Sequence, residues 1–339
     1  MRPFAFQTVD TPTAAAATAA DVRAHDAAAS PVQFLAGGTT LIDLMKLDVM
    51  RPERVVDINA LGTNALGRIE ATEKGLRLGA LVRMAEAADH ETINKEFPAI
   101  AQALQLAASP QIRNMASLGG NVLQRTRCPY FRDVSYAQCN KRDPGSGCAA
   151  IDGFNRMHAV LAGSEHCIAT YPGDFAQALI AFDATVDITG PRVMRNIPFA
   201  ALHRPPADAP HIETQLQPGE IITAFIVPSL RWGKRSLFLK IRDRQSYEFA
   251  LASAVVALDV DDGHVRDARI ALGGVATVPW RATVAEAVLR GQPTRDTTWQ
   301  TAADAAFADA RGYQHNAFKV ELGKRTLRRA LAQTAAMEI

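Results

Sequence analysis

The fold of this chain is decided by the stretch Leu35-Ala36-Gly37-Gly38-Thr39-Thr40-Leu41-Ile42. Residues 32–36 are apolar and predict a short strand, while residues 39–47 carry apolar side chains at helical spacing. Two glycines between a strand and a helix let the backbone approach a ligand, and free N–H groups at a helix start favour a phosphate. The stretch lacks the G-x-G-x-x-G pattern of the Rossmann fold, so alone it indicates a turn at least as readily as a nucleotide site.

A second glycine turn, Ser117-Leu118-Gly119-Gly120-Asn121, offers the same chemistry further along the chain. It combines a hydroxyl group, two unhindered peptide units and an amide side chain, and all of these suit a phosphate. Two such loops in one domain are able to hold one diphosphate from both sides. The pair therefore indicates a diphosphate ligand more strongly than either loop alone.

The segments around these loops predict alternating strands and helices. Residues 54–58 form a β-branched strand, which completes a β–α–β unit over residues 32–58. Thr11-Pro12 is typical of a helix start, and a helix through about residue 28 is expected to follow. Apolar patterns predict further strands at residues 76–78, 181–188 and 221–227, and helices at residues 82–90 and 98–108.

A second α+β unit is expected beyond Trp232-Gly233. Its predicted strands are residues 238–241, 252–260 and 265–272, and its predicted helices are residues 284–290, 301–311 and 319–333. A length of 339 residues also favours two domains over one core.

The composition is that of a globular protein, with 48% hydrophobic and 21% charged residues. A formal net charge of +2 gives no basic field for nucleic acid. No apolar run approaches the ~20 residues of a membrane helix, and residues 1–10 carry no signal-peptide pattern. We therefore expect neither a nucleic-acid partner nor a membrane partner, and no export signal in this chain.

The cysteines are concentrated in one segment. All four, Cys128, Cys139, Cys148 and Cys167, follow the spacing C-x10-C-x8-C-x18-C. This differs from the C-x2-C knuckles of structural zinc and from the compact ferredoxin pattern, although four thiolates are the usual ligands of a [4Fe–4S] cluster. A cluster, a zinc site and two disulfides all remain open on spacing alone.

Basic residues crowd the same segment and suit an anionic centre. They are Arg125, Arg127, Arg132, Lys141 and Arg142. A cluster with four thiolate ligands carries net negative charge, and nearby cations and N–H donors stabilise it. Glycines and prolines around the cysteines predict loop structure rather than regular elements.

Taken together, the motifs resemble those of the FAD-binding subunits of xanthine dehydrogenase-type molybdenum hydroxylases. The resemblance rests on both glycine loops and on three later motifs, which are Pro218-Gly219-Glu220-Ile221-Ile222, Phe238-Leu239-Lys240-Ile241-Arg242-Asp243-Arg244 and Ala271-Leu272-Gly273-Gly274-Val275-Ala276. It covers nearly the whole chain in the same order. It implies an α+β fold, with a vanillyl-alcohol-oxidase-type (PCMH-like) FAD-binding domain in two subdomains over residues 1–231. A C-terminal α+β domain would occupy residues 232–339.

The resemblance also implies roles for particular residues. Residues 35–42 would line the FAD pyrophosphate, namely Leu35, Ala36, Gly37, Gly38, Thr39, Thr40, Leu41 and Ile42. Ser117, Gly120 and Asn121 would complete this grip. Ile222 would pack against the isoalloxazine ring, and Lys240 would lie near its polar edge. Asp133 is the candidate for an aspartate that the family carries after the second glycine loop.

The cysteine segment, an insertion at about residues 122–170, is similar to that of bacterial periplasmic aldehyde oxidoreductases. The similarity lies in Gln124-Arg125-Thr126-Arg127-Cys128-Pro129-Tyr130-Phe131, Cys139-Asn140-Lys141-Arg142 and Pro144-Gly145-Ser146-Gly147-Cys148-Ala149-Ala150. It implies that all four cysteines ligate a [4Fe–4S] cluster. It further implies a heterotrimer with a small [2Fe–2S] subunit and a large molybdenum-cofactor subunit that oxidises aldehydes. Electrons would pass through FAD to an external acceptor, and export to the periplasm would depend on a partner that carries the signal.

One segment departs from the family. NAD-using members carry an aromatic–glycine–tyrosine loop before the Pro-Gly-Glu motif, whereas this chain has Phe199-Ala200-Ala201-Leu202-His203-Arg204-Pro205. NAD is therefore a doubtful acceptor. Because the cofactor does the redox chemistry, no acid–base catalytic residue is expected here. The alternatives are a zinc-stabilised nucleotide-binding module without redox activity and a self-sufficient flavin oxidase.

Overall fold

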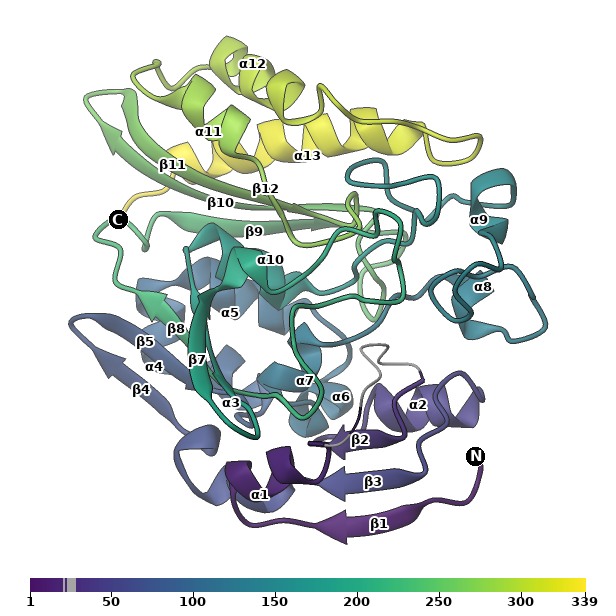
Figure 1. Ribbon diagram of the computed structural model, residues 1–339. Coiled ribbons are helices and arrows are strands. Elements are labelled where there is room, and N and C mark those ends of the chain that lie inside the picture. Colours follow the sequence, from purple (N-terminus) through teal and green to yellow (C-terminus); the bar gives the residue numbers. More distant parts are fainter. Residues whose placement is uncertain (21, 23–28) are drawn as a thin grey trace.

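The computed structural model describes residues 1–20, 22 and 29–339, and it arranges them in three layers of sheet and helix. In Figure 1 the N-terminal sheet lies at the bottom, a larger sheet in the middle and the C-terminal sheet at the top. The cysteine segment lies to one side of these layers. Within the described ranges, none of the helices has the length and apolar character needed to cross a membrane.

The N-terminal layer is a small parallel sheet. Its strands are β1 (Ala5–Thr8), β2 (Val32–Leu35) and β3 (Arg54–Asp57), in the order β1-β3-β2. Helix α2 (Leu41–Lys46) connects β2 to β3, which confirms the predicted β–α–β unit. Helix α1 covers only Pro12–Ala17, and residues 18–20 form turns. The remainder of the predicted helix falls partly on residues 21 and 23–28, which lie outside the described residues.

The middle layer is a five-stranded sheet, and all the pairings along it are antiparallel. Its order is β4 (Ile69–Thr72), β5 (Gly75–Gly79), β8 (Ile221–Pro228), β6 (Thr185–Thr189) and β7 (Met194–Pro198). The helices of this layer are α3 (Met84–Asp89), α4 (Glu91–Glu96), α5 (Pro98–Gln105), α6 (Pro110–Met115), α7 (Leu118–Val122) and α10 (Asp174–Ala181). Three short 3₁₀ helices, at Asn59–Thr63, Ala65–Gly67 and Phe199–Ala201, complete the first two layers.

The predicted strand over residues 181–188 was wrong at its beginning. Ala181 ends α10, and the strand starts only at Thr185. The apolar residues of this run recur at helical spacing and are all buried, as expected of a helix enclosed in the core. They are Phe175, Ala178, Leu179 and Phe182. A short apolar run does not by itself distinguish a buried strand from a buried helix.

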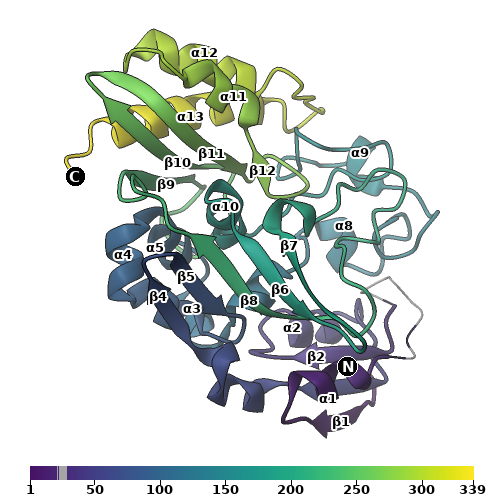
Figure 2. The ribbon, with the colours of Figure 1, turned by 60° about the vertical axis from the view of Figure 1, so that its left-hand side comes forward.

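The C-terminal layer is an antiparallel sheet covered on both faces. Its order is β12 (Trp280–Arg281), β11 (His264–Gly273), β10 (Ala252–Asp261) and β9 (Ser236–Ile241). Successive side chains of a strand point to opposite faces. Accordingly, Val255 and Ala257 join the core of the middle layer, whereas Val256 and Leu258 pack on the outer helices. Those helices are α11 (Thr283–Leu289), α12 (Asp296–Ala306) and α13 (Phe318–Ala335). Figure 2 shows α10 and the middle sheet beneath this layer.

The cysteine segment is mostly loop, as predicted, with two short helices α8 (Pro129–Arg132) and α9 (Ala149–Asp152). Buried polar side chains from the C-terminal domain hold it. The ammonium group of Lys319, on α13, donates to the carbonyl oxygens of Met157 at 3.2 Å and His158 at 2.9 Å, and also to that of Gly274. Asn316 donates to the carbonyl of His158 as well, at 3.3 Å. We call Asn316 and Lys319 the clasp.

Candidate functional site

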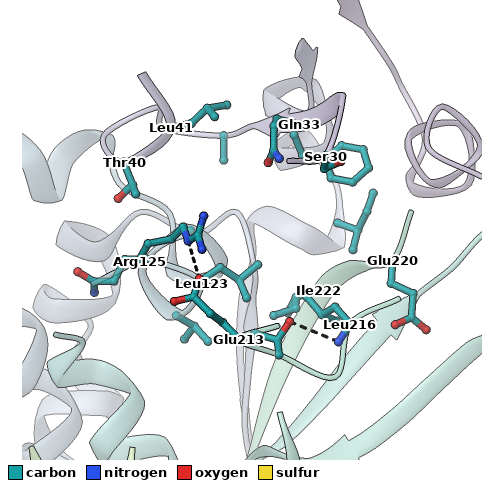
Figure 3. Close-up of a pocket in the computed structure, with 18 of the residues that line it drawn as sticks. Ser30, Gln33, Thr40, Leu41, Leu123, Arg125, Glu213, Leu216, Glu220 and Ile222 are labelled. Atoms are coloured by element: carbon teal, nitrogen blue, oxygen red, sulfur yellow. Dashed lines mark hydrogen bonds and ion pairs between the residues drawn. The ribbon is translucent and has the colours of Figure 1, made fainter. Parts of the chain in front are cut away.

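A cavity of about 330 Å³ lies between the two glycine loops, β8 and the cysteine segment. Figure 3 shows part of its lining, with Thr40 and Leu41 on one side and Glu213 and Ile222 opposite. The first glycine loop contributes Ala36 to Leu41, and the second contributes Ser117, Gly119 and Gly120. Both loops therefore border the same cavity, as expected if they bind one ligand from two sides.

Close packing of the two loops explains why glycine stands at position 37. A β-carbon on Gly37 would lie 2.0 Å from the carbonyl oxygen of Met115, the last residue of α6, just before the second loop. Gly38 has φ +73°, a conformation that glycine adopts without strain. In the second loop, the Ser117 hydroxyl accepts from the N–H of Gly120 at 3.2 Å and caps α7.

The structure gathers most of the residues that the sequence nominated around this cavity, but not all of them. Those that line it are Ala36, Gly37, Gly38, Thr39, Thr40, Leu41, Ser117, Gly120 and Ile222. Leu35, Ile42, Asn121, Asp133 and Lys240 are outside its lining. Asp133 lies on an exposed turn, where its carboxylate accepts from the N–H of Ser135 at 2.9 Å. Its predicted place beside the flavin gains no support from this position.

Lys240 is engaged elsewhere. Its ammonium group pairs with the carboxylate of Asp174 at 2.7 Å and donates to the carbonyl of Leu106 at 3.1 Å. The two side chains of this pair are only 2% and 4% exposed. Burial raises the pKa of Asp174, and the attraction of Lys240 opposes that rise. The motif around Lys240 thus supplies a buried ion pair between the middle layer and the C-terminal sheet.

The sequence analysis missed an ionic triad in the cavity wall, formed by Arg125, Lys141 and Glu213. The guanidinium of Arg125 and the ammonium of Lys141 both bind the carboxylate of Glu213, the latter at 2.8 Å. All three residues line the cavity. Burial opposes ionisation of Glu213, but the two cations outweigh it and lower its pKa to about 2. The basic residues were visible in the sequence, whereas Glu213 lies in a segment without periodic pattern.

A second, much smaller cavity lies next to the first and collects the four cysteines. Cys128, Cys139, Cys148 and Cys167 all line it. All four are described by the structure and are free thiols, so the disulfide interpretation finds no support. Lys141, Cys167 and Ala169 line both cavities. The two sites therefore share a wall.

Three of the thiols are buried and that of Cys148 is half-buried, and they lie close enough to influence one another. Burial, with smaller contributions from the neighbouring Cys167 and Cys139, raises the pKa of Cys128 to about 12. Burial likewise raises the pKa of Cys167 to about 11, which Lys141 opposes. The ring of His158 lies 3.2 Å from the sulfur of Cys128 through Nε2. A bound cationic centre would be needed to hold these thiols as thiolates.

Comparison with known proteins agrees with this geometry. Residues 5–230 match the family described as FAD binding domain in molybdopterin dehydrogenase, and residues 238–334 match the CO dehydrogenase flavoprotein C-terminal domain. The chain is 46% identical over 338 residues to PaoB, the aldehyde oxidoreductase FAD-binding subunit of Escherichia coli strain K12, covering 99% of each protein. It is 23% identical to the xanthine dehydrogenase FAD-binding subunit of Escherichia coli O157:H7, over 87% of this chain and 84% of that one.

Among solved structures, a chain of CO dehydrogenase from Oligotropha carboxidovorans superposes with a TM-score of 0.75. The superposition covers 99% of both chains at 21% sequence identity, so it shows the fold alone. The expected α+β architecture is confirmed by this likeness and by the two family matches.

The layered fold and the cavity between two glycine loops define a flavin-nucleotide-binding subunit of an oxidoreductase. More particularly, the chain belongs to the FAD-binding subunits of the molybdenum hydroxylases. The resemblance inferred from the sequence is confirmed. Known members of this group are subunits or medium chains of larger enzymes.

Proposed function

We propose that this chain carries both FAD and a [4Fe–4S] cluster in a molybdenum hydroxylase that oxidises aldehydes to carboxylic acids. The observation that supports the cluster is the convergence of all four cysteines on one small cavity. This cavity shares Lys141 and Cys167 with the nucleotide cavity, so the two cofactors would be neighbours.

A cluster suits the cysteine cavity better than zinc does. With Zn–S bonds near 2.3 Å, a tetrahedral zinc ion holds its sulfurs roughly 3.8 Å apart. Among the described residues, no three His, Cys, Asp or Glu side chains stand close enough for a single ion. A cluster is a larger body whose ligands stand further apart. Lys141, together with Arg125 on the other side of the shared wall, supplies positive charge beside the thiolates.

The chain's own part is to bind and orient the cofactors. Bound FAD supplies the one- and two-electron chemistry, and the glycine loops would hold its diphosphate. In the proposed heterotrimer, a large molybdenum subunit would oxidise the aldehyde with water and release two electrons and two protons. A small [2Fe–2S] subunit would relay the electrons to this chain and on to an external acceptor. NAD remains a doubtful acceptor, because residues 199–205 lack the aromatic–glycine–tyrosine loop.

The aldehyde substrate rests on the 46% identical relative, which is named an aldehyde oxidoreductase subunit. We extend the proposal to the compartment on the resemblance alone. Folded and loaded with its cofactors, the complex would reach the periplasm through a signal on a partner subunit. The nucleotide-binding module without redox activity is the competing function, and it requires a protein without flavin absorbance.

Cofactor analysis of the purified complex tests the proposal. We expect one FAD per chain and four irons with matching acid-labile sulfide, after the small subunit's iron is subtracted. Cys128→Ser and Cys148→Ser should remove only these four irons and keep FAD. Gly120→Ala, in the nucleotide cavity, is the matched control and should weaken FAD binding while the iron stays.

Each possible outcome is informative. Zinc in place of the additional iron would contradict the cluster and leave the FAD subunit standing. FAD without any metal at the cysteines would likewise contradict the cluster but not the assignment as an FAD subunit. An intact complex that holds the iron of the small subunit but no FAD would overturn the proposed function as a whole.

A further inference from the structure

The guanidinium group of Arg125 is an unusual feature of the nucleotide cavity, because part of it has no partner. The side chain is 5% exposed, stacks on the ring of Phe131 at 4.7 Å and binds Glu213 through Nε. Both Nη1 and Nη2 are buried, and none of the described residues accepts a hydrogen bond from either. An unpaired buried donor costs free energy, so these N–H groups call for an acceptor.

A second arginine–glutamate pair near the same cavity, Arg195 with Glu220, gives a comparison, because its arginine has acceptors at two of its nitrogen atoms. Arg195 donates twice to the carboxylate of Glu220, at 2.7 Å each, and once to the carbonyl of Gln215 at 2.9 Å. Glu220 lines the cavity, but Arg195 does not. Arg125, by contrast, lies in the lining with free donors. Figure 3 shows its guanidinium above the Glu213 carboxylate and directed toward the middle of the cavity.

The charge of the triad indicates what kind of acceptor fits. Arg125 and Lys141 contribute two positive charges against one negative charge of Glu213, which leaves a net charge of +1 in a buried wall. The backbone N–H groups of the first glycine loop are available to the diphosphate of FAD. In the second loop, the N–H groups of Leu118, Gly119 and Gly120 already donate within the protein. The remaining oxygen acceptors of FAD are on the ribityl chain, the adenosine and the pyrimidine edge of the flavin ring. Only the ring gains negative charge during turnover.

We infer that Arg125 donates to the pyrimidine edge of the bound flavin and stabilises its reduced form. An oxidised ring that takes up two electrons and one proton carries one negative charge, which a buried guanidinium attracts strongly. The electrons are those that the partner subunits deliver, and the proton comes from solvent. Glu213 and Lys141 act as positioning residues. The carboxylate of Glu213 fixes the orientation of the Arg125 guanidinium, and the ammonium group of Lys141 balances part of the negative charge on that carboxylate. This inference rests on the FAD part of the proposed function and does not need the cluster.

The midpoint potential of FAD in the intact complex tests this role. We expect Arg125→Gln to weaken binding of reduced FAD at least tenfold relative to oxidised FAD. For a two-electron couple this is a shift of about 30 mV toward more negative potential. Glu213 keeps Lys141 as its partner in this variant, and Arg125→Lys, which retains the charge, should recover most of the shift. Arg195→Gln is the matched control and should leave the potential unchanged.

Affinity for oxidised FAD separates the ring from other parts of the cofactor. If Arg125→Gln lowers the affinity of the deflavo-complex for FAD but leaves the potential unchanged, Arg125 binds a phosphate or the adenosine, and the inference is overturned. If neither quantity changes in Arg125→Gln and Arg125→Lys, the triad is only structural, and the inference is overturned as well. The FAD content of the wild-type complex is measured before the potentials. A wild-type complex without FAD would refute the proposed function itself, and this outcome is distinct from an unchanged potential in Arg125→Gln.

Discussion

The nucleotide cavity and the cysteine cavity share a wall, yet they are built differently. The nucleotide cavity is formed by backbone at the junctions of β2 with α2 and of α6 with α7, where Gly37 touches Met115. The cysteine cavity is formed by loops, and side chains far away in the sequence hold these loops in place. Regular elements with their own hydrogen bonds keep the first cavity in shape. The second is held by side-chain hydrogen bonds of Asn140 and Arg142 within the segment, and the clasp adds contacts at Met157 and His158.

The two cavities should therefore respond to different substitutions. A change at Glu213, which holds Lys141 of the shared wall, should disturb both cavities. A change in the clasp should disturb only the cysteine cavity, and a change in a glycine loop only the nucleotide cavity.

Removing the charge of Glu213 should have the largest effect. Glu213→Gln leaves Arg125 and Lys141 without a counter-charge, and we expect a loss of about 3–5 kcal/mol of unfolding free energy at pH 7. The wild-type pKa of about 2 lies below the ordinary 4.5. The ion pair therefore stabilises fully above pH 4.5, and this contribution, on the order of 3 kcal/mol, is lost as pH falls from 4.5 through 2.

Denaturant unfolding of wild type and Glu213→Gln between pH 7 and pH 3 measures this contribution. The difference between the two proteins should shrink as the pH falls through this window. A difference that stays constant across the window would show that Glu213 acts through packing and not through its charge.

Cutting the clasp should affect the cysteine cavity alone. Lys319→Met removes the donor from three carbonyls, two of them buried, and we expect a cost of about 3 kcal/mol. Amide hydrogen exchange should accelerate at residues 155–168, and FAD affinity should stay at the wild-type value. Equal acceleration in residues 35–46 would contradict the independence of the two cavities.

The two glycine loops should show the smallest effects on stability and differ from one another. Gly37→Ala forces a β-carbon against the carbonyl of Met115, and we expect about 2 kcal/mol of destabilisation with weaker FAD binding. A β-carbon on Gly120 meets only the Ser117 hydroxyl, at 3.0 Å. Gly120→Ala should therefore change the unfolding free energy by less than about 0.5 kcal/mol and lower only the affinity for FAD, as thermal unfolding with added FAD would reveal.

The sequence alone predicted the β–α–β unit and the C-terminal sheet well, because apolar periodicity and glycine turns are local signals. The cavity lining from Ala36 to Leu41 followed from the same turns. The triad was not predictable, because Arg125 and Glu213 are 88 positions apart and only the fold joins them. Lys240 was recognised by its motif, but its partner Asp174 starts a helix that was not predicted, and only its last residue fell in the predicted strand over residues 181–188. Ionic contacts between distant segments leave no periodic trace in a sequence.

The clasp also sets an order of events during synthesis of the chain. Lys319 follows Met157 by 162 positions, so the ribosome completes the cysteine segment long before its clasp exists. At ordinary elongation rates this interval lasts roughly 8–30 s. Throughout that time the carbonyls of Met157 and His158 lack their donor from α13. If the proposed cluster is inserted during this interval, its iron meets a cysteine segment that Lys319 does not yet hold.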